Sequence, residues 1–193
     1  MLILTCPAQL QRLEGALRRS LPLALPVHGA VMNINRGNPG EFEVVVDSWP
    51  EFGAVLARPS GELETGVVSG PWGHWGGQSW HAGRLLTAHP PRRLDPSVRV
   101  ASLSPSHVDL LNETWPYGGN SRSRRYLAEL LRCFPNICLQ DGAGQPLSWS
   151  LTDHFGTGAH GYTLPAHRRR GHMQAVMVLA ARRAQARGFF AFG

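Results

Sequence analysis

The sequence contains no lysine, because all 19 of its basic residues are arginine. A Schiff base and a phosphate-binding loop of the Walker type both require a lysine amine, so this chain can use neither. Acidic residues are also fewer than basic ones, with 13 against 19. The formal charge of +6 and the pI of about 10.2 favour polyanionic partners such as nucleic acid, anionic lipid or a phosphate-rich cofactor.

Cysteine is scarce as well, and Cys6, Cys133 and Cys138 form an odd set without zinc-binding spacing. A disulfide framework is therefore not expected, a reducing compartment is, and all three thiols are predicted to be buried. The apolar runs are short. A run such as 21–27 falls far short of the roughly 20 residues that span a bilayer, so we predict no transmembrane segment.

Leucines recur at helical spacing near the start of the chain, at Leu10, Leu13 and Leu17. This spacing predicts a first helix with one buried stripe. The arginines of the same stretch are also compatible with a mitochondrial presequence. Antiparallel strands are predicted to follow at residues 27–34, 42–46 and 54–57, with a corner at 47–50.

The stretch from residue 61 to about 95 is rich in Gly, Pro, Trp and His and shows neither helical nor alternating periodicity. It is predicted to be a flexible, irregular insert. His74, His81 and His89 lie in it without nearby cysteine or ligand-like spacing, so no metal site is predicted there.

Regular patterns return after residue 104. Ser106 is predicted to cap a short helix that ends at Leu111, and Asn120 or Ser121 to cap a longer one that ends at Phe134. The remaining predicted elements are a hairpin of strands at 137–139 and 147–151, a strand at 159–164 and a helix at 171–187.

The segment from His160 to Met173 carries the clearest chemistry, because a strand is predicted to lead through an arginine-rich loop at 168–171 into a helix N-terminus. Unpaired backbone N–H groups and the positive end of the helix dipole would face that loop, which predicts a phosphate site. The arginines add forked donors that suit phosphate oxygens. A solvated basic loop is the alternative that the pattern alone leaves open.

Arg168-Arg169-Arg170-Gly171 resembles the first part of the Arg/Gln-x-x-Gly-x-Gly/Ala signature of the GNAT acyltransferase superfamily. Further segments are similar to those of the glycine N-acyltransferase family and occur in the same order: Ile34-Asn35-Arg36-Gly37-Asn38-Pro39, Val46-Asp47-Ser48-Trp49-Pro50, Gly118-Gly119-Asn120, Cys133-Phe134-Pro135 and Tyr162-Thr163-Leu164-Pro165. The resemblance covers roughly residues 1–60 and 101–188. It leaves the middle of the chain unmatched.

The resemblance implies a GNAT-like α+β fold with α/β/α layers, in which a mixed, mostly antiparallel sheet is incomplete at its C-terminal end. It divides the chain into a helix-plus-strands half at 1–60, a Gly/Trp/Pro-rich irregular insert at 61–100 and an acyl-coenzyme A-binding half at 101–193. It also implies a mitochondrial location, with a cytoplasmic one as the alternative, and we expect a monomer.

The activity that the resemblance implies is transfer of an acyl group from acyl-coenzyme A, as co-substrate, to the amine of glycine or a similar small amino acid, with no metal. The acceptor would enter near Gly119 and Asn120. The residues implied for acyl-coenzyme A are Tyr162, Thr163 and Leu164 along the pantetheine arm, and Arg168, Arg169, Arg170, Gly171, His172 and Met173 around the pyrophosphate.

The chain departs from the family at three places. Thr157 stands where the family has its proposed general-base glutamate, and no carboxylate follows Asp153, so His160 is the predicted catalytic substitute. Met173 replaces a small last residue of the phosphate signature. The chain also ends where the family's next strand would begin, which predicts a shortened cofactor cleft.

Two alternatives stay open. A non-catalytic acyl-coenzyme A binder, or an inactive shortened family member, is consistent with Thr157 and the missing strands. A basic nucleic-acid-binding protein is the lower alternative, because aromatic residues do not interleave with the arginine clusters as stacking platforms would require.

Overall fold

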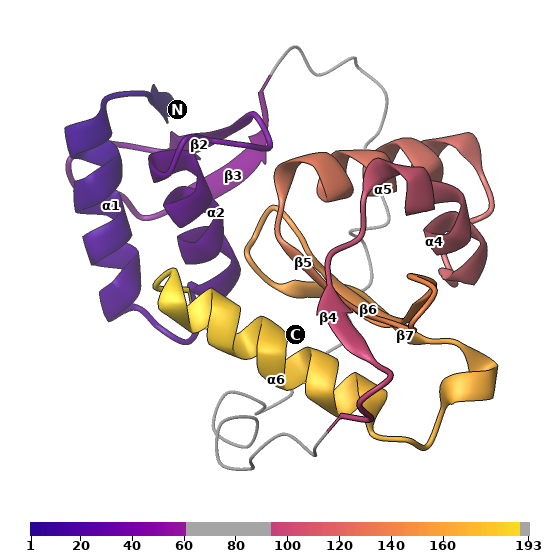
Figure 1. Cartoon of the computed structure of the whole chain (residues 1–193). Helices are drawn as coiled ribbons and strands as arrows, with labels where there is room; N and C mark the ends of the chain where they lie inside the picture. The colour runs from indigo at the N-terminus through magenta and orange to yellow at the C-terminus, as the bar shows by residue number, and fades with distance from the viewer. Residues whose placement is uncertain (61–93, 190–193) are drawn as a thin grey trace.

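The computed structural model describes residues 1–60 and 94–189, which form two antiparallel sheets with their helices (Figure 1). The N-terminal half contains a three-stranded sheet in the order β1-β2-β3, and the C-terminal half a four-stranded sheet in the order β4-β5-β6-β7. Figure 1 shows α4 and α5 on one face of the larger sheet and α6 on the other. The C-terminal half therefore has the α/β/α layers expected for the α+β fold.

The first sheet is covered by two helices that precede its central strand. The elements of this half are β1 (Leu2–Leu4), α1 (Pro7–Arg19), α2 (Leu25–Asn35), β2 (Phe42–Val46) and β3 (Val55–Pro59). As predicted, α1 buries Leu10, Leu13 and Leu17 on one stripe. The same apolar stripe packs on Val44 and Val46 of β2, so the spacing of the leucines fixes which face of α1 meets the sheet.

The strand predicted at 27–34 was wrong, because these residues belong to α2. Every residue from His28 to Asn33 is buried. A segment that is covered on all sides shows no 3.6-residue period, and a short apolar run of this kind cannot be told from a buried strand. Pro26 in the first turn is compatible with a helix start.

The second sheet follows the predicted order more closely. Its elements are β4 (Arg99–Ala101), the 3-10 turn η2 (Pro105–His107), α4 (Val108–Thr114), α5 (Ser121–Cys133), β5 (Asn136–Gln140), β6 (Pro146–Thr152), β7 (Gly158–Thr163), η3 (Pro165–His167) and α6 (His172–Ala186). The hairpin, the strand after it and the last helix were all predicted. Strands β1 and β4 were not, and β4 crosses the expected boundary at residue 100.

Helix caps explain where the two helices above this sheet begin. The Asn120 side chain accepts a hydrogen bond from the Ser123 N–H at 2.8 Å, so the predicted cap of α5 is confirmed. The cap predicted at Ser106 was wrong, because Ser104 forms a capping box with His107 around η2 and α4 begins only at Val108. A 3-10 turn thus precedes α4.

Buried aromatic and aliphatic side chains hold the C-terminal half together, with Trp149 fully buried beneath α4 and α5. Cys138 belongs to this core and Cys133 is half-buried, but Cys6 is exposed. The prediction that all three thiols are buried is therefore confirmed only for Cys138. It was wrong for Cys6, which precedes α1 and lies outside its apolar stripe, and Cys133 is only partly covered.

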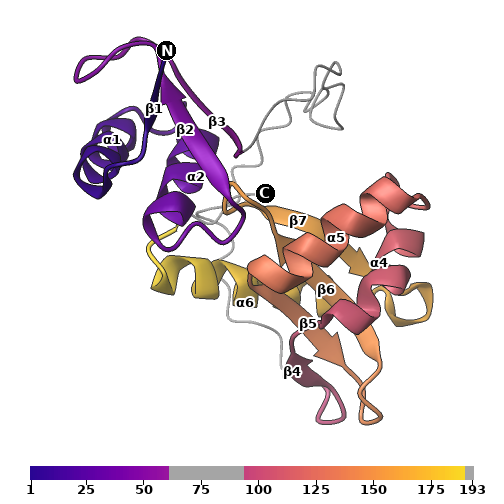
Figure 2. The same cartoon turned by 90° about the horizontal axis from the view of Figure 1, so that it is seen from above.

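The two halves meet where α2 and β2 contact the turn after β6. The Asn33 amide donates to the His154 carbonyl at 2.9 Å, and the His154 ring stacks on Phe42 with centroids 4.6 Å apart. Gly29 approaches the Phe155 carbonyl so closely that a Cβ there would lie 1.9 Å from the oxygen. This contact fixes the position of α2 beside the larger sheet, as Figure 2 shows from above.

Candidate functional site

A groove lies where β7 ends and α6 begins, on the path through η3 and the arginine-rich loop. Its lining residues are Gly161, Tyr162, Thr163, His167, Arg168, Arg169, Gly171, His172, Met173 and Gln174. The structure therefore brings together seven of the residues predicted for acyl-coenzyme A. Leu164 instead packs against the core above the sheet, and Arg170 does not line the groove.

The N-terminus of α6 is open at the groove. Its N-cap is Gly171, which offers no side-chain acceptor, and no acidic residue stands in the first turn. The first backbone N–H groups of the helix therefore retain their capacity to bind an anion, which the helix dipole favours. Gly171 has a φ of +80°, a left-handed conformation that glycine adopts without a steric penalty.

Arg168 folds back on β7 instead of extending into solvent. Its Nε donates to the Thr163 carbonyl at 3.1 Å, and Nη2 donates to the Tyr162 hydroxyl at 3.3 Å. Its guanidinium also stands 5.4 Å from the centre of the Tyr162 ring. Arg168 thus fastens the loop to the strand and leaves part of its donor set for a ligand.

The next two arginines diverge. Arg169 lines the groove in an exposed position and has a φ of +62°. Arg170 does not line the groove and instead interacts electrostatically with Asp95. Hydrogen bonds from Ser97 lower the pKa of Asp95, and the charge of Arg170 adds to that shift. Three consecutive side chains on a tight loop cannot all face one ligand, so the predicted cluster contributes two arginines to the groove.

Two histidines border the same loop. The rings of His167 and His172 stack with centroids 6.3 Å apart, and His172 is buried. Burial lowers the pKa of His172, and the positive charges of His167 and Arg170 lower it further. Its Nδ1 is buried and has no hydrogen-bond partner among the described residues. His167 was not among the predicted site residues, although it lies within the segment that predicted the site.

Strand β7 offers the groove an unpaired edge. It pairs with β6 on one side, and among the strands that the structure describes it has no neighbour on the other. Its register shifts opposite Trp149 and Leu151, which marks a β-bulge. The Met173 sulfur lies 3.6 Å from where a Cβ on Gly161 would stand, so the methionine occupies space beside the strand.

His160 lies at the bulge with a φ of +44°. Its Nδ1 accepts a hydrogen bond from Trp149 Nε1 at 3.1 Å. The Leu111 carbonyl, 2.8 Å from Nε2, can only accept, so Nε2 carries the proton. Burial lowers the pKa of His160. The ring is thus neutral near pH 7, with both nitrogens engaged.

Thr157, where the resemblance implies a glutamate, is hydrogen-bonded to Asp153. Its hydroxyl donates to Asp153 Oδ2 at 2.6 Å and its N–H to Oδ1 at 2.9 Å. Burial raises the pKa of Asp153, while the hydrogen bonds from Thr157 and Phe155 act against that shift. These bonds close the turn between β6 and β7.

Gly119 and Asn120, the predicted acceptor site, form the turn between α4 and α5. The Gly119 N–H donates to the Asn112 carbonyl at 2.9 Å, and Asn120 caps α5. From the same connection, Trp115 contacts His160 with ring centroids 5.8 Å apart. The turn is thus linked through Trp115 to the bulge in β7.

The described residues contain no group of three His, Cys, Asp or Glu that could hold a metal ion. No metal site was predicted at the histidines of the Gly/Trp/Pro-rich stretch, and these residues lie outside the described part of the chain: His74, His81 and His89. None of the helices that the structure describes is both long and apolar enough to cross a membrane.

Comparison with known proteins gives this geometry a context. A family model described as aralkyl acyl-CoA:amino acid N-acyltransferase matches residues 1–67 and 78–135. The match includes most of the stretch at 61–100, so the expectation that the middle of the chain lies outside the resemblance was wrong. It ends before β5, so the groove lies beyond the matched residues.

Two curated relatives span most of the chain. Glycine N-phenylacetyltransferase from Bos taurus is 31% identical over 88% of this chain and 82% of its own length. Glycine N-acyltransferase from Bos taurus is 28% identical over 98% of this chain and 88% of its own length. An X-ray structure of a Drosophila protein matches with a TM-score of 0.48 and 19% identity, over 57% of this chain and 38% of that one, which is too weak to bear on function.

Proposed function

This chain belongs to the aralkyl acyl-CoA:amino acid N-acyltransferase family, and from this premise we propose that it transfers an acyl group from acyl-coenzyme A to the amine of glycine or a similar small amino acid. The description of the family model supports acyl-coenzyme A as the donor, and the names of the relatives support glycine as the acceptor. The residues around the groove are the part of the chain that we assign to acyl-coenzyme A.

The observation that carries the proposal is the open N-terminus of α6 beside the unpaired edge of β7. A pyrophosphate fits the free N–H groups behind Gly171, with Arg168 and Arg169 as charged donors. A pantetheine arm carries amide groups, which can pair with the free backbone edge of β7 from Gly158 to Thr163. The residues present therefore fit the co-substrate.

The chemistry is acyl transfer without a covalent enzyme intermediate. The amine must lose its extra proton before its lone pair attacks the thioester carbonyl. The C–N bond then forms, the C–S bond breaks, and the second amine proton leaves while the coenzyme A sulfur takes up one proton. Backbone N–H groups at the edge of β7 are the donors that we assign to the oxyanion.

His160 remains the residue predicted to assist proton removal, and its contacts define what that role requires. Its only lone pair, on Nδ1, accepts the Trp149 N–H. Proton transfer at His160 would therefore require that hydrogen bond to open. A positioning role, in which His160 holds the bulge of β7 against Leu111 and Trp149, uses the bonds as they stand.

The proposal is tested by release of free coenzyme A from acyl-coenzyme A when glycine, or a panel of small amines, is added to the folded chain. We expect turnover that depends on the amine. Arg169→Gln should raise the KM for acyl-coenzyme A about tenfold, because it removes a charged donor from the groove. Arg132→Gln, an equal charge change on α5 outside the groove, should leave KM unchanged.

A non-catalytic acyl-coenzyme A binder is the second candidate, favoured by Thr157 where the family has a carboxylate. Calorimetry with acyl-coenzyme A separates the two. Binding without turnover supports the second candidate, and a folded chain that neither binds nor reacts contradicts both.

The finer proposals concern location and assembly. We propose a mitochondrial location, supported by the arginines of α1 and by the family. Imaging of the full chain with a C-terminal fluorescent tag tests it, and a diffuse signal outside mitochondria would contradict it. We also propose a monomer, which light scattering tests by mass.

A further inference from the structure

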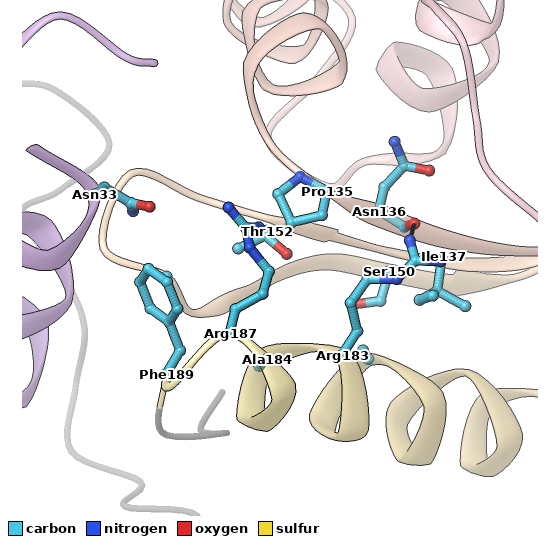
Figure 3. A pocket seen from close by; sticks show the side chains of 12 residues that line it. Asn33, Pro135, Asn136, Ile137, Ser150, Thr152, Arg183, Ala184, Arg187 and Phe189 are labelled. Carbon is cyan, nitrogen blue, oxygen red and sulfur yellow. Dashed lines mark hydrogen bonds between the residues drawn. The ribbon is translucent and has the colours of Figure 1, made fainter. Parts of the chain in front are cut away.

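A second pocket lies at the other end of α6, between that helix, the sheet and α2 (Figure 3). Its lining residues are Asn33, Pro135, Asn136, Ile137, Ser150, Thr152, Gly156, Ala180, Arg183, Ala184, Arg187 and Phe189. Gly171 and Arg187 stand at opposite ends of α6, roughly 24 Å apart at the rise of a helix. The pocket is therefore separate from the groove.

The charge in this pocket is of one sign. Among the described residues that line it, only Arg183 and Arg187 are charged. Arg183 lies in the last turn of α6, and Arg187 is the C-cap residue four positions later. Figure 3 shows both side chains directed toward the sheet. Within residues 1–60 and 94–189 no carboxylate lines the pocket to balance them, so two like charges face the same small space.

Most donors of these arginines are unused. Arg183 donates one hydrogen bond from Nη1, to the Asn136 carbonyl at 2.8 Å. The Arg187 guanidinium stands 5.7 Å from the centre of the Phe189 ring and has no hydrogen bond or ion pair with any residue that the structure describes. A guanidinium carries five N–H donors in a planar fork.

Helix capping does not account for the pair. Cations near a helix C-terminus are favoured by the dipole, but the carbonyls of Ala184 and Gln185 in the last turn of α6 already have backbone partners. The Arg187 and Phe189 N–H groups both donate to the Ala184 carbonyl, and the Gly188 N–H donates to the Gln185 carbonyl. Neither guanidinium group is bonded to these carbonyls, so the donors left over by the Asn136 contact remain available to a ligand.

A third arginine strengthens the positive field. Arg36, the C-cap residue of α2, also stands over the Phe189 ring, at 5.5 Å, and its ion pair with Glu14 is long at 3.5 Å. The ring is therefore flanked by guanidinium groups from both halves of the molecule.

The pocket also limits the size of a ligand. The space open to the centres of water molecules is about 30 Å³, which is room for roughly two waters. Ile137, Ala180 and Ala184 form apolar walls. A compact carboxylate fits this space.

We propose that this pocket binds a compact carboxylate, of the size of formate or of the carboxylate end of glycine, between Arg183 and Arg187. Planar guanidinium groups match the two oxygens of a carboxylate. The bound anion links α6 with the sheet next to α2, so the site stabilises the junction of the two halves.

The test is thermal unfolding of the full chain with sodium formate, against sodium chloride and sodium sulfate at equal ionic strength. We expect formate to raise the unfolding midpoint by roughly 3 °C, as a ligand at several times its Kd does for a chain of this size. Arg187→Gln should remove most of that rise and Arg183→Gln part of it. Arg182→Gln, on the same helix but outside the pocket, should keep it.

Three results would overturn the proposal: no rise with formate, an equal rise with chloride, or an undiminished rise in Arg187→Gln. Glycine at the same concentration separates the two sources of the carboxylate. When formate raises the midpoint, a further rise with glycine that Arg187→Gln removes assigns the site to the amino acid. A rise with formate but not with glycine assigns it to the free small acid.

Discussion

At the scale of single residues, His160 determines how the edge strand meets the helices above it. We expect His160→Asn to lower the free energy of unfolding by about 2 kcal/mol, because the fully buried Trp149 loses the acceptor of its N–H and the Leu111 carbonyl loses its donor. Asparagine tolerates the positive φ, so strain adds little. Urea unfolding at pH 7 measures the change, and a loss below about 0.5 kcal/mol would contradict it.

The same residue gives stability a pH dependence. The folded pKa of His160 lies below the ordinary value of 6.5, so the unfolded chain binds the proton more tightly. Its contribution to stability is complete above pH 6.5 and is lost as the pH falls through that value toward the folded pKa. His160→Asn should show a flatter decline between pH 7 and 5, and an unchanged slope would assign the decline to other groups such as His28 and His172.

A second residue, His172, is expected to make acyl-coenzyme A binding depend on pH through proton uptake. Burial, then His167 and Arg170, lower its pKa in the free protein, while Asp95 acts in the opposite direction. A phosphate bound at the loop would raise the pKa, so binding should take up protons and tighten as the pH falls from 8 to 6, by at most about tenfold per unit for one proton.

Calorimetry in buffers of different ionisation enthalpy measures that proton uptake. His172→Gln should show less uptake than the wild type, and the titration of the ligand's own phosphates cancels in the comparison. Equal uptake in both proteins would show that His172 does not sense the ligand.

At the scale of elements, Gly171 at the start of α6 has two roles: it adopts a left-handed backbone conformation and it lines the groove. We expect Gly171→Ala to lower the free energy of unfolding by about 1 kcal/mol, since alanine at a φ of +80° is strained, and to weaken acyl-coenzyme A binding as the added methyl enters the loop. Gly142→Ala is the matched control, because Gly142 has open space and no positive φ. Equal effects of the two substitutions on binding would contradict the assignment of the loop.

The elements also show which parts of the structure the sequence could predict. Periodicity identified α1 and α5, because their buried apolar residues recur at helical spacing between exposed polar ones. It failed for α2, because Gly29 and Asn33 are covered by the other half and not by local neighbours. Three residues at 99–101 are too few to show alternation, and β4 exists through its pairing with β5.

The candidate site was predictable for a different reason. Gly171 and the arginines before it mark a loop that enters a helix, and that order of residues is local. The directions of the side chains depend on the folded backbone. Arg169 has a left-handed backbone conformation, so that Arg168 points to Tyr162 and Arg170 points away from the groove. Spacing alone cannot supply such directions.

At the scale of the whole molecule, the junction of the two halves depends on a backbone approach that only glycine permits. A Cβ on Gly29 of α2 would lie 1.9 Å from the Phe155 carbonyl oxygen, and backbone cannot yield as a side chain could. We expect Gly29→Ala to cost more than about 3 kcal/mol of unfolding free energy, since it must displace the turn that also carries the bonds of His154 to Asn33 and Glu129.

Gly15 provides the matched comparison within the same half. It also lies inside a helix, α1, but nothing stands within 4 Å of the point where a Cβ on Gly15 would lie. Gly15→Ala should raise the free energy of unfolding by about 0.5–1 kcal/mol through helix propensity alone. Because both changes add one methyl to a helical glycine, opposite signs in urea unfolding would trace the cost at Gly29 to the contact between the halves, and two gains of similar size would show that the halves do not meet there in solution.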